Sequence, residues 1–331
     1  MLDLIQDSQI QQILNPPNAS PDWQHDLNRL LNRDLSLNRR SAGENSIKAF
    51  QRLMIFLGYS TASSGGFLID GDFGRGSNRG LAQFQFEHGL APANIKRTTI
   101  TYECSWSNAR QLITKIPDVE LTIATLERLL EEAKSAIDSG RLNCGNFDEA
   151  IFHLNALQGR NYLNCKQINE RYGRQVETAV QNIQNKYGYQ VQPEWILAII
   201  RQETQGVVRP RFEQHWFSKL ARQKPDGDLR EFRFQAMSFG LGQILGVNYK
   251  RVNANSAFGL YTSSITEQIE AIGRFLTRFR KVRPVIAKTR PTDTDFRTLA
   301  YYYNGSGYAR HHYHERIASW FREFKKLRSP D

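Results

Sequence analysis

The chain has 331 residues, of which 40% are hydrophobic and 11% aromatic. This length and composition exclude an intrinsically disordered chain and leave room for two or three domains with separate cores. The net charge of +11 lies entirely in the second half: residues 191–331 hold 24 Lys+Arg against 13 Asp+Glu, while residues 1–190 hold 20 of each. An anionic partner is therefore expected there, such as nucleic acid, an anionic membrane or an anionic cell-wall polymer.

The first residues predict a protein that is made in the cytoplasm without a signal peptide. The stretch "MLDLIQDSQIQQIL" lacks a basic leader followed by an apolar run. No stretch approaches the roughly 18 apolar residues that span a bilayer, so no transmembrane segment is expected. The cysteines Cys104, Cys144 and Cys165 lack metal-ligand spacing and are expected to be reduced thiols.

The first hundred residues predict a short helical extension and a compact helical unit. Residues 1–40 indicate a short helix, a loop at "NPPNASPD" and a second helix near "WQHDLNRLLNRDL". Within residues 41–100, "SIKAFQRLMIFLGY" has helical spacing and Gly58 at the position of a C-terminal cap. After the turn "DGDFGRGS", the stretch "SNRGLAQFQFEHGL" predicts another helix, with Ser77 as its N-cap.

This unit resembles the small peptidoglycan-binding domain of cell-wall hydrolases, a three-helix bundle. The resemblance rests on "LGY", "IDGDFG" and "LAQFQFEHGL", and the long insert "STASSGGFLI" departs from the family pattern. It implies a wall-binding module whose candidate residues are Asp70, Asp72, Phe73 and Gln85. The alternative is that the same residues only stabilise a turn, with aspartate as cap, glycine at positive φ and phenylalanine in the core.

Residues 101–170 predict a helical connector without a chemical signature. The stretch "TLERLLEEAKSAIDSG" is amphipathic, with Thr125 and Gly140 as expected caps. Two further helices are expected at "FDEAIFHLNALQGRNYL" and "VETAVQNIQNKYGYQ". The last of these would open a C-terminal domain over residues 171–331.

The first candidate for chemistry is "PEWILAIIRQETQG", residues 193–206, an oily helix that ends on Glu203. Glu203 lies one turn beyond Ile199 and Ile200, on the same helix face. A carboxyl held in a dry place has its charged form disfavoured, so its pKa rises toward neutrality. Such an acid can deliver a proton to the leaving oxygen of a glycosidic bond.

Two later stretches join this helix in a recognisable order. They are "AMSFGLGQILGVNY", residues 236–249, and "AYYYNGSGYARHHY", residues 300–313. The order resembles the lysozyme-like superfamily, and more closely the bacterial and phage N-acetylmuramidases of modular endolysins. The matching motifs are "ETQG", "FEQHWF", "SFGLGQILGVNY" and "YNGSGY", within about residues 175 to 325.

The resemblance implies a mainly α protein with an α+β lysozyme-like catalytic domain that cleaves between N-acetylmuramic acid and N-acetylglucosamine. It implies Glu203 as the catalytic acid and no cofactor. The substrate-binding candidates are Ser238, Gln243, Tyr303, Asn304 and Tyr308.

The second carboxylate is less defined by sequence. Glu213 is the first candidate, but only nine residues separate it from Glu203, and "ETQG" lacks the family's serine-glycine pair. Asp226, Asp228 and Glu231 are the reserves. Zinc at the "HHYH" histidines is disfavoured because HExxH is absent, so no metal is expected.

Three other functions stay open. A lytic transglycosylase would form 1,6-anhydro products with a single glutamate, and a non-catalytic wall-binding component of a phage tail or contractile injection device would need none. Nucleic-acid binding rests on charge alone and is not expected. A monomer acting on peptidoglycan in the cell wall is expected, after release by lysis or export by a dedicated machine; a holin, an injection-machine component or an immunity protein is a possible partner.

Overall fold

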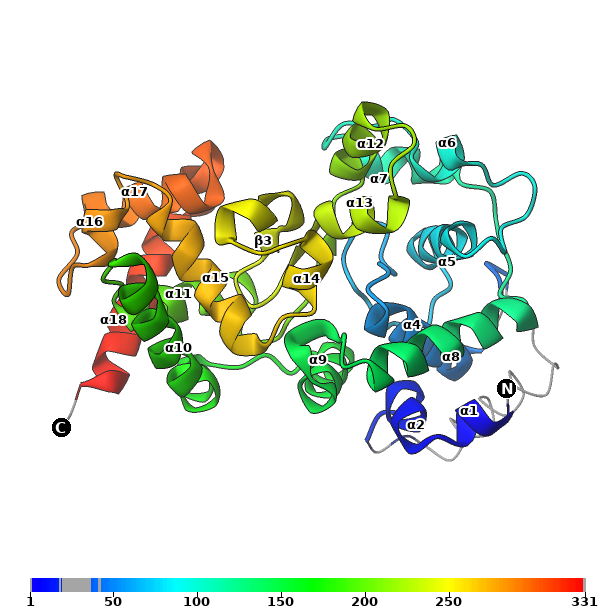
Figure 1. Ribbon diagram of the computed structural model, residues 1–331, viewed down its shortest axis with the longest axis horizontal. Coiled ribbons are helices and arrows are strands. Elements are labelled where there is room, and N and C mark those ends of the chain that lie inside the picture. The colour runs from blue at the N-terminus through cyan, green and yellow to red at the C-terminus, as the bar shows by residue number, and fades with distance from the viewer. Residues whose placement is uncertain (1, 18, 20–36, 41–42, 330–331) are drawn as a thin grey trace. The chain divides into compact units, whose positions relative to one another are not determined.

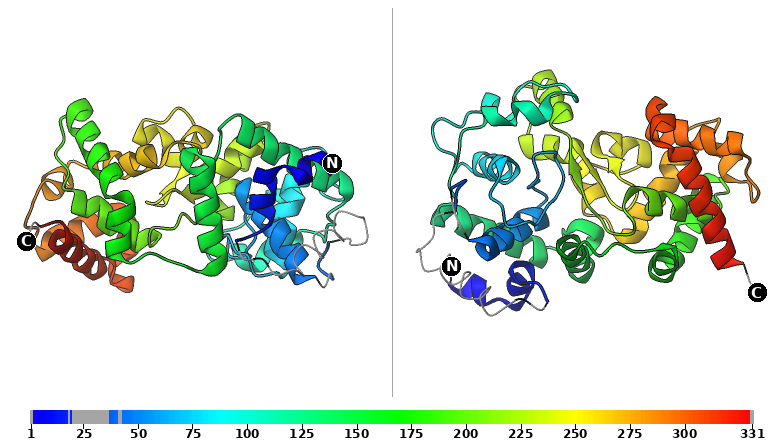
Figure 2. Two further views of the ribbon diagram at one scale, coloured as in Figure 1. Left: turned by 90° about the horizontal axis from the view of Figure 1, so that it is seen from below. Right: turned by 180° about the vertical axis from the view of Figure 1, so that it is seen from behind.

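The computed structural model describes residues 2–17, 19, 37–40 and 43–329. Contacts divide the chain into two compact units (Figures 1 and 2). Unit 1 comprises Met1–Asn161 and Arg209–Ser238, and unit 2 comprises Tyr162–Val208 and Phe239–Asp331. Both units consist mainly of helices joined by loops and very short strands, which confirms the predicted mainly α class.

Unit 1 holds the elements that precede residue 161 and those of the segment Arg209–Ser238, and only the last residue of β2 belongs to unit 2. The helices before residue 161 are α1 (Leu2–Gln6), α2 (Ser8–Leu14), α4 (Glu44–Phe56), α5 (Arg75–Glu87), α6 (Arg97–Ile100), α7 (Ala109–Leu112), η1 (Ile113–Lys115), α8 (Ile123–Asp138), η2 (Asn143–Gly145) and α9 (Phe147–Gly159). The later elements are β1 (Arg211–Phe212), α12 (Gln214–Gln223), α13 (Leu229–Gln235) and β2 (Met237–Phe239). The helix predicted near "WQHDLNRLLNRDL" lies outside the described residues.

The glycine-rich turn between α4 and α5 is held by Gln51 of α4. The Gln51 side-chain oxygen accepts from the backbone N–H groups of Asp70 and Gly71, and its amide donates to the Asp70 carboxylate. Phe73 stacks on Phe50 with ring centroids 5.3 Å apart, and both are buried. The turn therefore organises the core of this unit, as its fold-stabilising interpretation expects.

Two predicted helix caps are wrong. Ser77 lies inside α5, which begins after Gly74, and its buried hydroxyl accepts a hydrogen bond from the Gln51 amide. Helix α8 begins after Thr122, whose side chain accepts from the backbone N–H of Thr125. In both cases the predicted residue lies one turn inside the helix, because tertiary burial decides where a serine or threonine is used.

The segment between residues 209 and 238 packs within unit 1. The Phe212 backbone N–H donates to the Gly65 carbonyl at 2.7 Å, and β1 pairs antiparallel with β2, with Phe212 opposite Met237. A Cβ on Gly65 would lie 1.9 Å from the Phe212 oxygen, so only glycine permits this approach. The insert "STASSGGFLI" is thus a docking point for β1.

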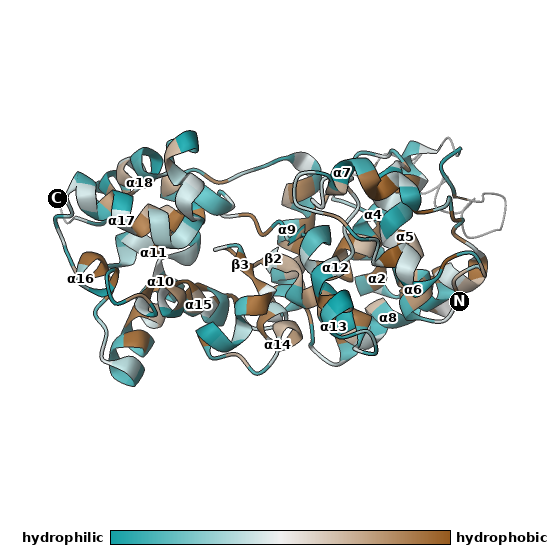
Figure 3. Cartoon of the chain, turned by 90° about the horizontal axis from the view of Figure 1, so that it is seen from above, coloured by the Kyte–Doolittle hydropathy of each residue, from teal (hydrophilic) through white to brown (hydrophobic). Residues whose placement is uncertain are grey.

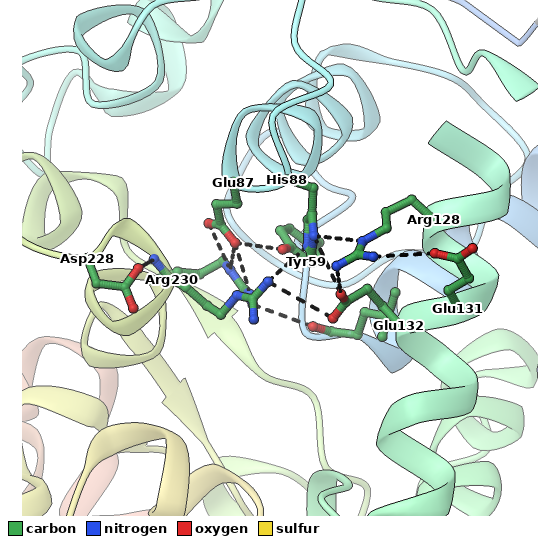
Figure 4. A network of polar contacts seen from close by, with 10 residues as sticks. Tyr59, Glu87, His88, Arg128, Glu131, Glu132, Asp228 and Arg230 are labelled. Atoms are coloured by element: carbon green, nitrogen blue, oxygen red, sulfur yellow. Dashed lines mark hydrogen bonds and ion pairs between the residues drawn. The ribbon is translucent and has the colours of Figure 1, made fainter. Parts of the chain in front are cut away.

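A buried ion pair ties α13 to the "LGY" and "FQFEHGL" motifs. The side chains of Arg233 and Glu87 are 3% and 2% exposed and lie 3.2 Å apart. Arg233 also donates to the Gly58 carbonyl at 2.8 Å and lies 3.8 Å from the ring centroid of Tyr59. The Tyr59 hydroxyl donates to Glu87 (Figure 4). Removing one partner of such a pair leaves a buried charge uncompensated, so Arg233 is a major link within unit 1.

Unit 2 is a helical body around α11. Its elements are α10 (Cys165–Tyr187), α11 (Pro193–Glu203), β3 (Ile244–Leu245), η3 (Gly246–Val252), α14 (Ala257–Tyr261), α15 (Ile265–Thr277), α16 (Arg283–Ile286), α17 (Asp293–Asn304), η4 (Ser306–His311) and α18 (Tyr313–Arg328). Helix α11 packs against α10 and α18, and α17 packs against α18.

Aromatic rings from three helices fill the core of unit 2. Trp195 of α11 lies 4.6 Å from Phe321 and 5.0 Å from Phe296, measured between ring centroids. Hydrophobic and hydrophilic residues alternate along the helices (Figure 3), as amphipathic packing requires. In the part of the chain that the structure describes, no helix combines the length and apolarity needed to cross a membrane. The three cysteines are free thiols.

Candidate active site

Helix α11 passes through the core of unit 2 and ends on Glu203, where the chain becomes partly exposed. Pro193 occupies the first turn, where its missing N–H costs nothing. Every residue from Trp195 to Ile200 is fully buried, whereas Glu203, the last helical residue, is half-buried. The structure therefore shows the predicted geometry, an apolar helix that ends on a partly dry carboxyl.

The chain turns sharply after Glu203, and tertiary contacts fix this turn. The buried Thr204 hydroxyl lies 3.0 Å from the Leu241 carbonyl oxygen, which joins the helix end to the "GLGQ" stretch. Gln205 and Gly206 both have left-handed backbones, with φ of 53° and 75°. The Tyr172 hydroxyl donates to the Gly206 carbonyl at 2.9 Å. The position of Glu203 is thus determined by buried neighbours on both sides of the chain reversal.

Tyr313 is a direct partner of Glu203. Its hydroxyl donates to Oε1 of Glu203 at 2.5 Å, and the tyrosine is buried at the start of α18. Burial raises the pKa of Tyr313 well above its ordinary value, and the adjacent Glu203 charge raises it further. The phenol consequently stays protonated and acts as a permanent hydrogen-bond donor.

Sequence reasoning missed Tyr313. It stands inside "HHYH", where the sequence disfavours zinc and indicates no other chemistry, and no spacing relates it to a glutamate 110 positions earlier. His312 contacts Glu315 at 3.1 Å instead. Within the described ranges, no group of three or more histidine, cysteine, aspartate or glutamate side chains could hold a metal ion.

Tyr303 of α17 binds the "GLGQ" stretch and is affected by the charge of Glu203. Its hydroxyl donates to the Gly242 carbonyl at 2.5 Å. Burial raises the pKa of Tyr303 well above its ordinary value, with a further increase from the Glu203 charge. A Cβ on Gly242 would lie 2.8 Å from the Tyr303 oxygen and 2.4 Å from Cγ1 of Ile272, so glycine is needed for this contact. Two predicted site residues, Glu203 and Tyr303, therefore interact electrostatically.

Gln243 has an unusual backbone for a non-glycine residue. Its φ is 51°, and the preceding Gly240 has a φ of 71°. The half-buried Gln243 side chain donates to the Gly240 carbonyl at 3.2 Å, which closes the turn on itself. Left-handed backbone at a non-glycine residue is concentrated at functional sites, where the surrounding structure compensates the strain.

The tyrosines around "YNGSGY" divide between core and surface. Tyr301 is 50% exposed, and the half-buried Tyr308 lies 6.4 Å from it, measured between ring centroids. Tyr302 packs against Phe279 at 4.9 Å. Asn304 ends α17 and is exposed. Tyr301 and Tyr308 therefore provide accessible aromatic surface. The Tyr303 hydroxyl is instead bound to the Gly242 carbonyl.

Glu213 belongs to unit 1, where it immediately precedes α12. Its side chain is largely buried and lies 2.9 Å from Nε of Arg211. Burial raises the pKa of Glu213, and the Arg211 charge opposes this shift. Ser238 also lies in unit 1, on β2 opposite Arg211. The reserve acids are in the same unit: Asp226 and Asp228 are exposed, and Glu231 is half-buried.

The candidate wall-binding residues fall into two groups. Phe73 and Gln85 are buried, and the Gln85 amide donates to the Glu120 carbonyl at 2.8 Å. Asp70 and Asp72 are exposed on the turn that precedes α5. Phe73 and Gln85 therefore have structural contacts, and wall binding by this module stays a prediction.

Comparison with known families characterises one segment in the second half of the chain. Residues 229–325 match the family model of the N-acetylmuramidases. The chain carries a muramidase domain. The matched segment contains five predicted substrate-binding residues, namely Ser238, Gln243, Tyr303, Asn304 and Tyr308, whereas Glu203 and Glu213 precede it.

The chain is a glycoside hydrolase of the lysozyme-like type, and the match over residues 229–325 supports peptidoglycan as its substrate. Among solved structures, it is similar to the crystal structure of Burkholderia AP3 phage endolysin, with 18% sequence identity and a TM-score of 0.36. That alignment covers 89% of this chain and 99% of the endolysin chain. No curated protein sequence matches this chain.

Proposed function

We propose that Glu203 is the general acid that cleaves the bond between N-acetylmuramic acid and N-acetylglucosamine. The observation that carries this proposal is the Tyr313–Glu203 hydrogen bond of 2.5 Å, at the end of a helix whose residues Trp195 to Ile200 are fully buried. A catalytic acid needs a fixed orientation and a partly dry setting, and both are present at Glu203. Tyr303 and Thr204 connect the same carboxyl region to the "GLGQ" stretch inside the family match.

The hydrogen bond from Tyr313 assigns different roles to the two carboxyl oxygens. Because Tyr313 donates to Oε1, the proton of a neutral Glu203 resides on Oε2. During cleavage the bond between C1 of N-acetylmuramic acid and the glycosidic oxygen breaks, and that oxygen takes the proton from Oε2. The electron pair of the broken bond leaves with the oxygen, and C1 acquires oxocarbenium character. The oxygen of a water molecule then bonds to C1, and the proton that it loses passes to a carboxylate, either Glu203 or the second acid.

We further propose that the flanking residues bind the sugars. Gln243 presents an amide next to backbone held in a left-handed turn, which suits an N-acetyl or hydroxyl group. Tyr301 and Tyr308 offer ring faces for sugar stacking, with Asn304 exposed beside them. Ser238 remains a candidate on β2.

The second carboxylate separates two reaction types. In the muramidase reaction, Glu213 or one of its reserves would activate water, act as nucleophile or stabilise the positive charge. Burial is the larger influence and raises the pKa of Glu213, while the ion pair with Arg211 favours the charged form that these roles require. A lytic transglycosylase would need Glu203 alone, since the 6-hydroxyl of N-acetylmuramic acid then attacks C1.

Product analysis with purified peptidoglycan tests the proposal. Glu203→Gln should abolish release of soluble fragments, whereas Glu170→Gln, an exposed glutamate on α10, should not. Wild-type products with reducing N-acetylmuramic acid ends support the muramidase. Anhydro ends would establish the transglycosylase, and full activity of Glu203→Gln would leave only a non-catalytic wall-binding role.

We also propose that residues 41–100 form a wall-binding module, beside a helical extension over 1–40, a connector over 101–170 and a catalytic domain over 171–331. The exposed Asp70 and Asp72 are its candidate contacts. Sedimentation with intact sacculi tests this, with Asp72→Ala expected to reduce the bound fraction and Asp118→Ala as the exposed control. Equal binding by both variants would remove Asp72 from the proposal.

A further inference from the structure

Unit 2 contains a strongly basic pocket that shares no residue with the Glu203 site. The pocket has a volume of about 320 Å³ and is lined mainly by arginine and tyrosine. The residues that matter for its chemistry are Tyr187, Tyr189, Arg251, Arg274, Arg278 and Arg283. They come from the end of α10 and the following loop, from η3, and from α15 and α16 with their connection.

The local charge is far from balanced. Residues 250–290 contain nine Lys+Arg and two Asp+Glu. One of these acids, Glu270, lies 3.5 Å from Nε of Arg274. Among the described residues, the guanidinium groups of Arg251 and Arg278 have no hydrogen-bond or ion-pair partner. Four cations that converge on one pocket repel each other, and a bound anion would offset this repulsion.

Two of the arginines are held in place. Arg283 donates through Nε to the Thr277 carbonyl at 2.6 Å, and its guanidinium lies 4.5 Å from the ring centroid of Tyr189. The side chain of Arg274 is only 11% exposed and is fixed by its ion pair. A site with anchored donors loses less entropy on binding than one made of free surface side chains.

Tyr187 reports the positive potential of the pocket. Partial burial raises the pKa of Tyr187, but a hydrogen bond from Asn253 and the charges of Arg274 and Lys186 outweigh it. The pKa of this phenol is consequently below its ordinary value. The Asn253 amide donates to the Tyr187 oxygen at 3.1 Å, which leaves this oxygen oriented within the pocket.

We propose that this pocket binds a phosphate group. Guanidinium groups bind carboxylate and phosphate through paired N–H donors, and a phosphate offers more oxygens than a carboxylate to several arginines at once. Four arginines against one neighbouring acid therefore match a phosphate better than a carboxylate. The phosphate comes either from free inorganic phosphate or from a phosphodiester polymer of the cell wall, and the chemistry of recognition is the same.

The competing explanation is that the arginines only stabilise helix ends. Arg274 and Arg278 lie in and after the last turn of α15, where cations favour the helix dipole. This explanation predicts changes in melting temperature without changes in ligand binding. It also gives no role to Tyr187 or to the unpaired guanidinium of Arg251.

Titration calorimetry of the full chain separates the two explanations. The probes are inorganic phosphate and poly(glycerol phosphate), titrated at constant ionic strength against chloride, because general screening must not change. The test variant is Arg251→Gln/Arg278→Gln, and the control is Arg280→Gln, an exposed arginine outside the pocket. The test variant should bind phosphate at least about tenfold more weakly, and the control should bind as the wild type does.

The two probes and the test variant give distinguishable results. Tighter binding of the polymer than of inorganic phosphate, lost in the test variant, supports the pocket with a wall polymer as its ligand. Similar affinity per phosphate for both probes, lost in the same variant, supports the pocket with free phosphate. Absence of binding by wild type, or equal binding by wild type and the test variant, overturns the proposal. Activity on phosphate-free peptidoglycan should persist in the test variant, so failure here is distinct from failure of Glu203 as the acid.

Discussion

Replacing Tyr313 with phenylalanine removes one hydroxyl and keeps the buried ring. The lost bond runs from the phenol to Oε1 of Glu203 at 2.5 Å. A hydrogen bond to a charged group contributes about 1.5–3 kcal/mol, and one pKa unit corresponds to about 1.4 kcal/mol. Because Glu203 is half-buried, solvent replaces part of the lost bond, so the lower end of this range applies.

The sign follows from which form of Glu203 the bond stabilises. A donated hydrogen bond favours the carboxylate, so Tyr313→Phe should raise the apparent pKa of Glu203 by about one unit. A general acid works only when protonated, and the alkaline limb of the pH profile of kcat/KM should therefore move to higher pH by that amount. Tyr313 itself does not produce this limb, because burial and the Glu203 charge hold its pKa well above the ordinary value.

The assay is turbidity loss of purified peptidoglycan across the pH range, with Tyr302→Phe as the control. Tyr302 lies on α17 and packs against Phe279, so its variant tests for general loss of a tyrosine hydroxyl. An alkaline limb that stays in place or moves to lower pH in Tyr313→Phe would refute the assigned role. So would an equal shift in Tyr302→Phe.

Three further predictions concern stability and packing. Arg233→Met leaves Glu87 buried without its partner and should lower the free energy of unfolding of unit 1 by about 3–5 kcal/mol, measured by denaturant unfolding. A loss below about 1 kcal/mol, typical of a surface ion pair, would contradict the argument. Burial, followed by the charges of Arg230, Arg128 and Arg233, lowers the pKa of His88 from 6.5 to about 4. As the pH falls from 6.5 toward 4, His88 is protonated in the unfolded state before the folded state, so the stability of the fold should decrease over this range. His88→Asn should flatten that fall in melting temperature, and an unchanged slope would count against it. Gly242→Ala should reduce activity at least about tenfold, because its Cβ meets Ile272 and displaces Tyr303; wild-type kinetics would show that the turn adjusts freely.

Hydrophobic periodicity predicted the helices that build the cores. The stretch that became α11 holds a continuous apolar run from Trp195 to Ile200, and all six residues are buried. Helix α4 and the positive φ of Gly58 follow from the same kind of local signal. Such features are readable because each depends on neighbours within a turn or two of the chain.

Partners that come from distant segments were not predictable in this way. Tyr313 reaches Glu203 from 110 positions away, and Thr204 reaches Leu241 from the helix end. Arg233 looks like a surface charge in "LREFRFQ", yet it is buried against Glu87. The packing of residues 209–238 within unit 1 depends on Gly65, whose role appears only when the Phe212 carbonyl approaches it.

The central claim is that Glu203 supplies the proton to the leaving oxygen. The most direct measurement compares wild type and Glu203→Gln on peptidoglycan and on an aryl glycoside of the same glycan, whose activated leaving group needs no proton. The account predicts a loss of about 10²- to 10⁴-fold on peptidoglycan and a much smaller loss in first-turnover release of the aryl group. Equal losses on the two substrates would contradict Glu203 as the acid.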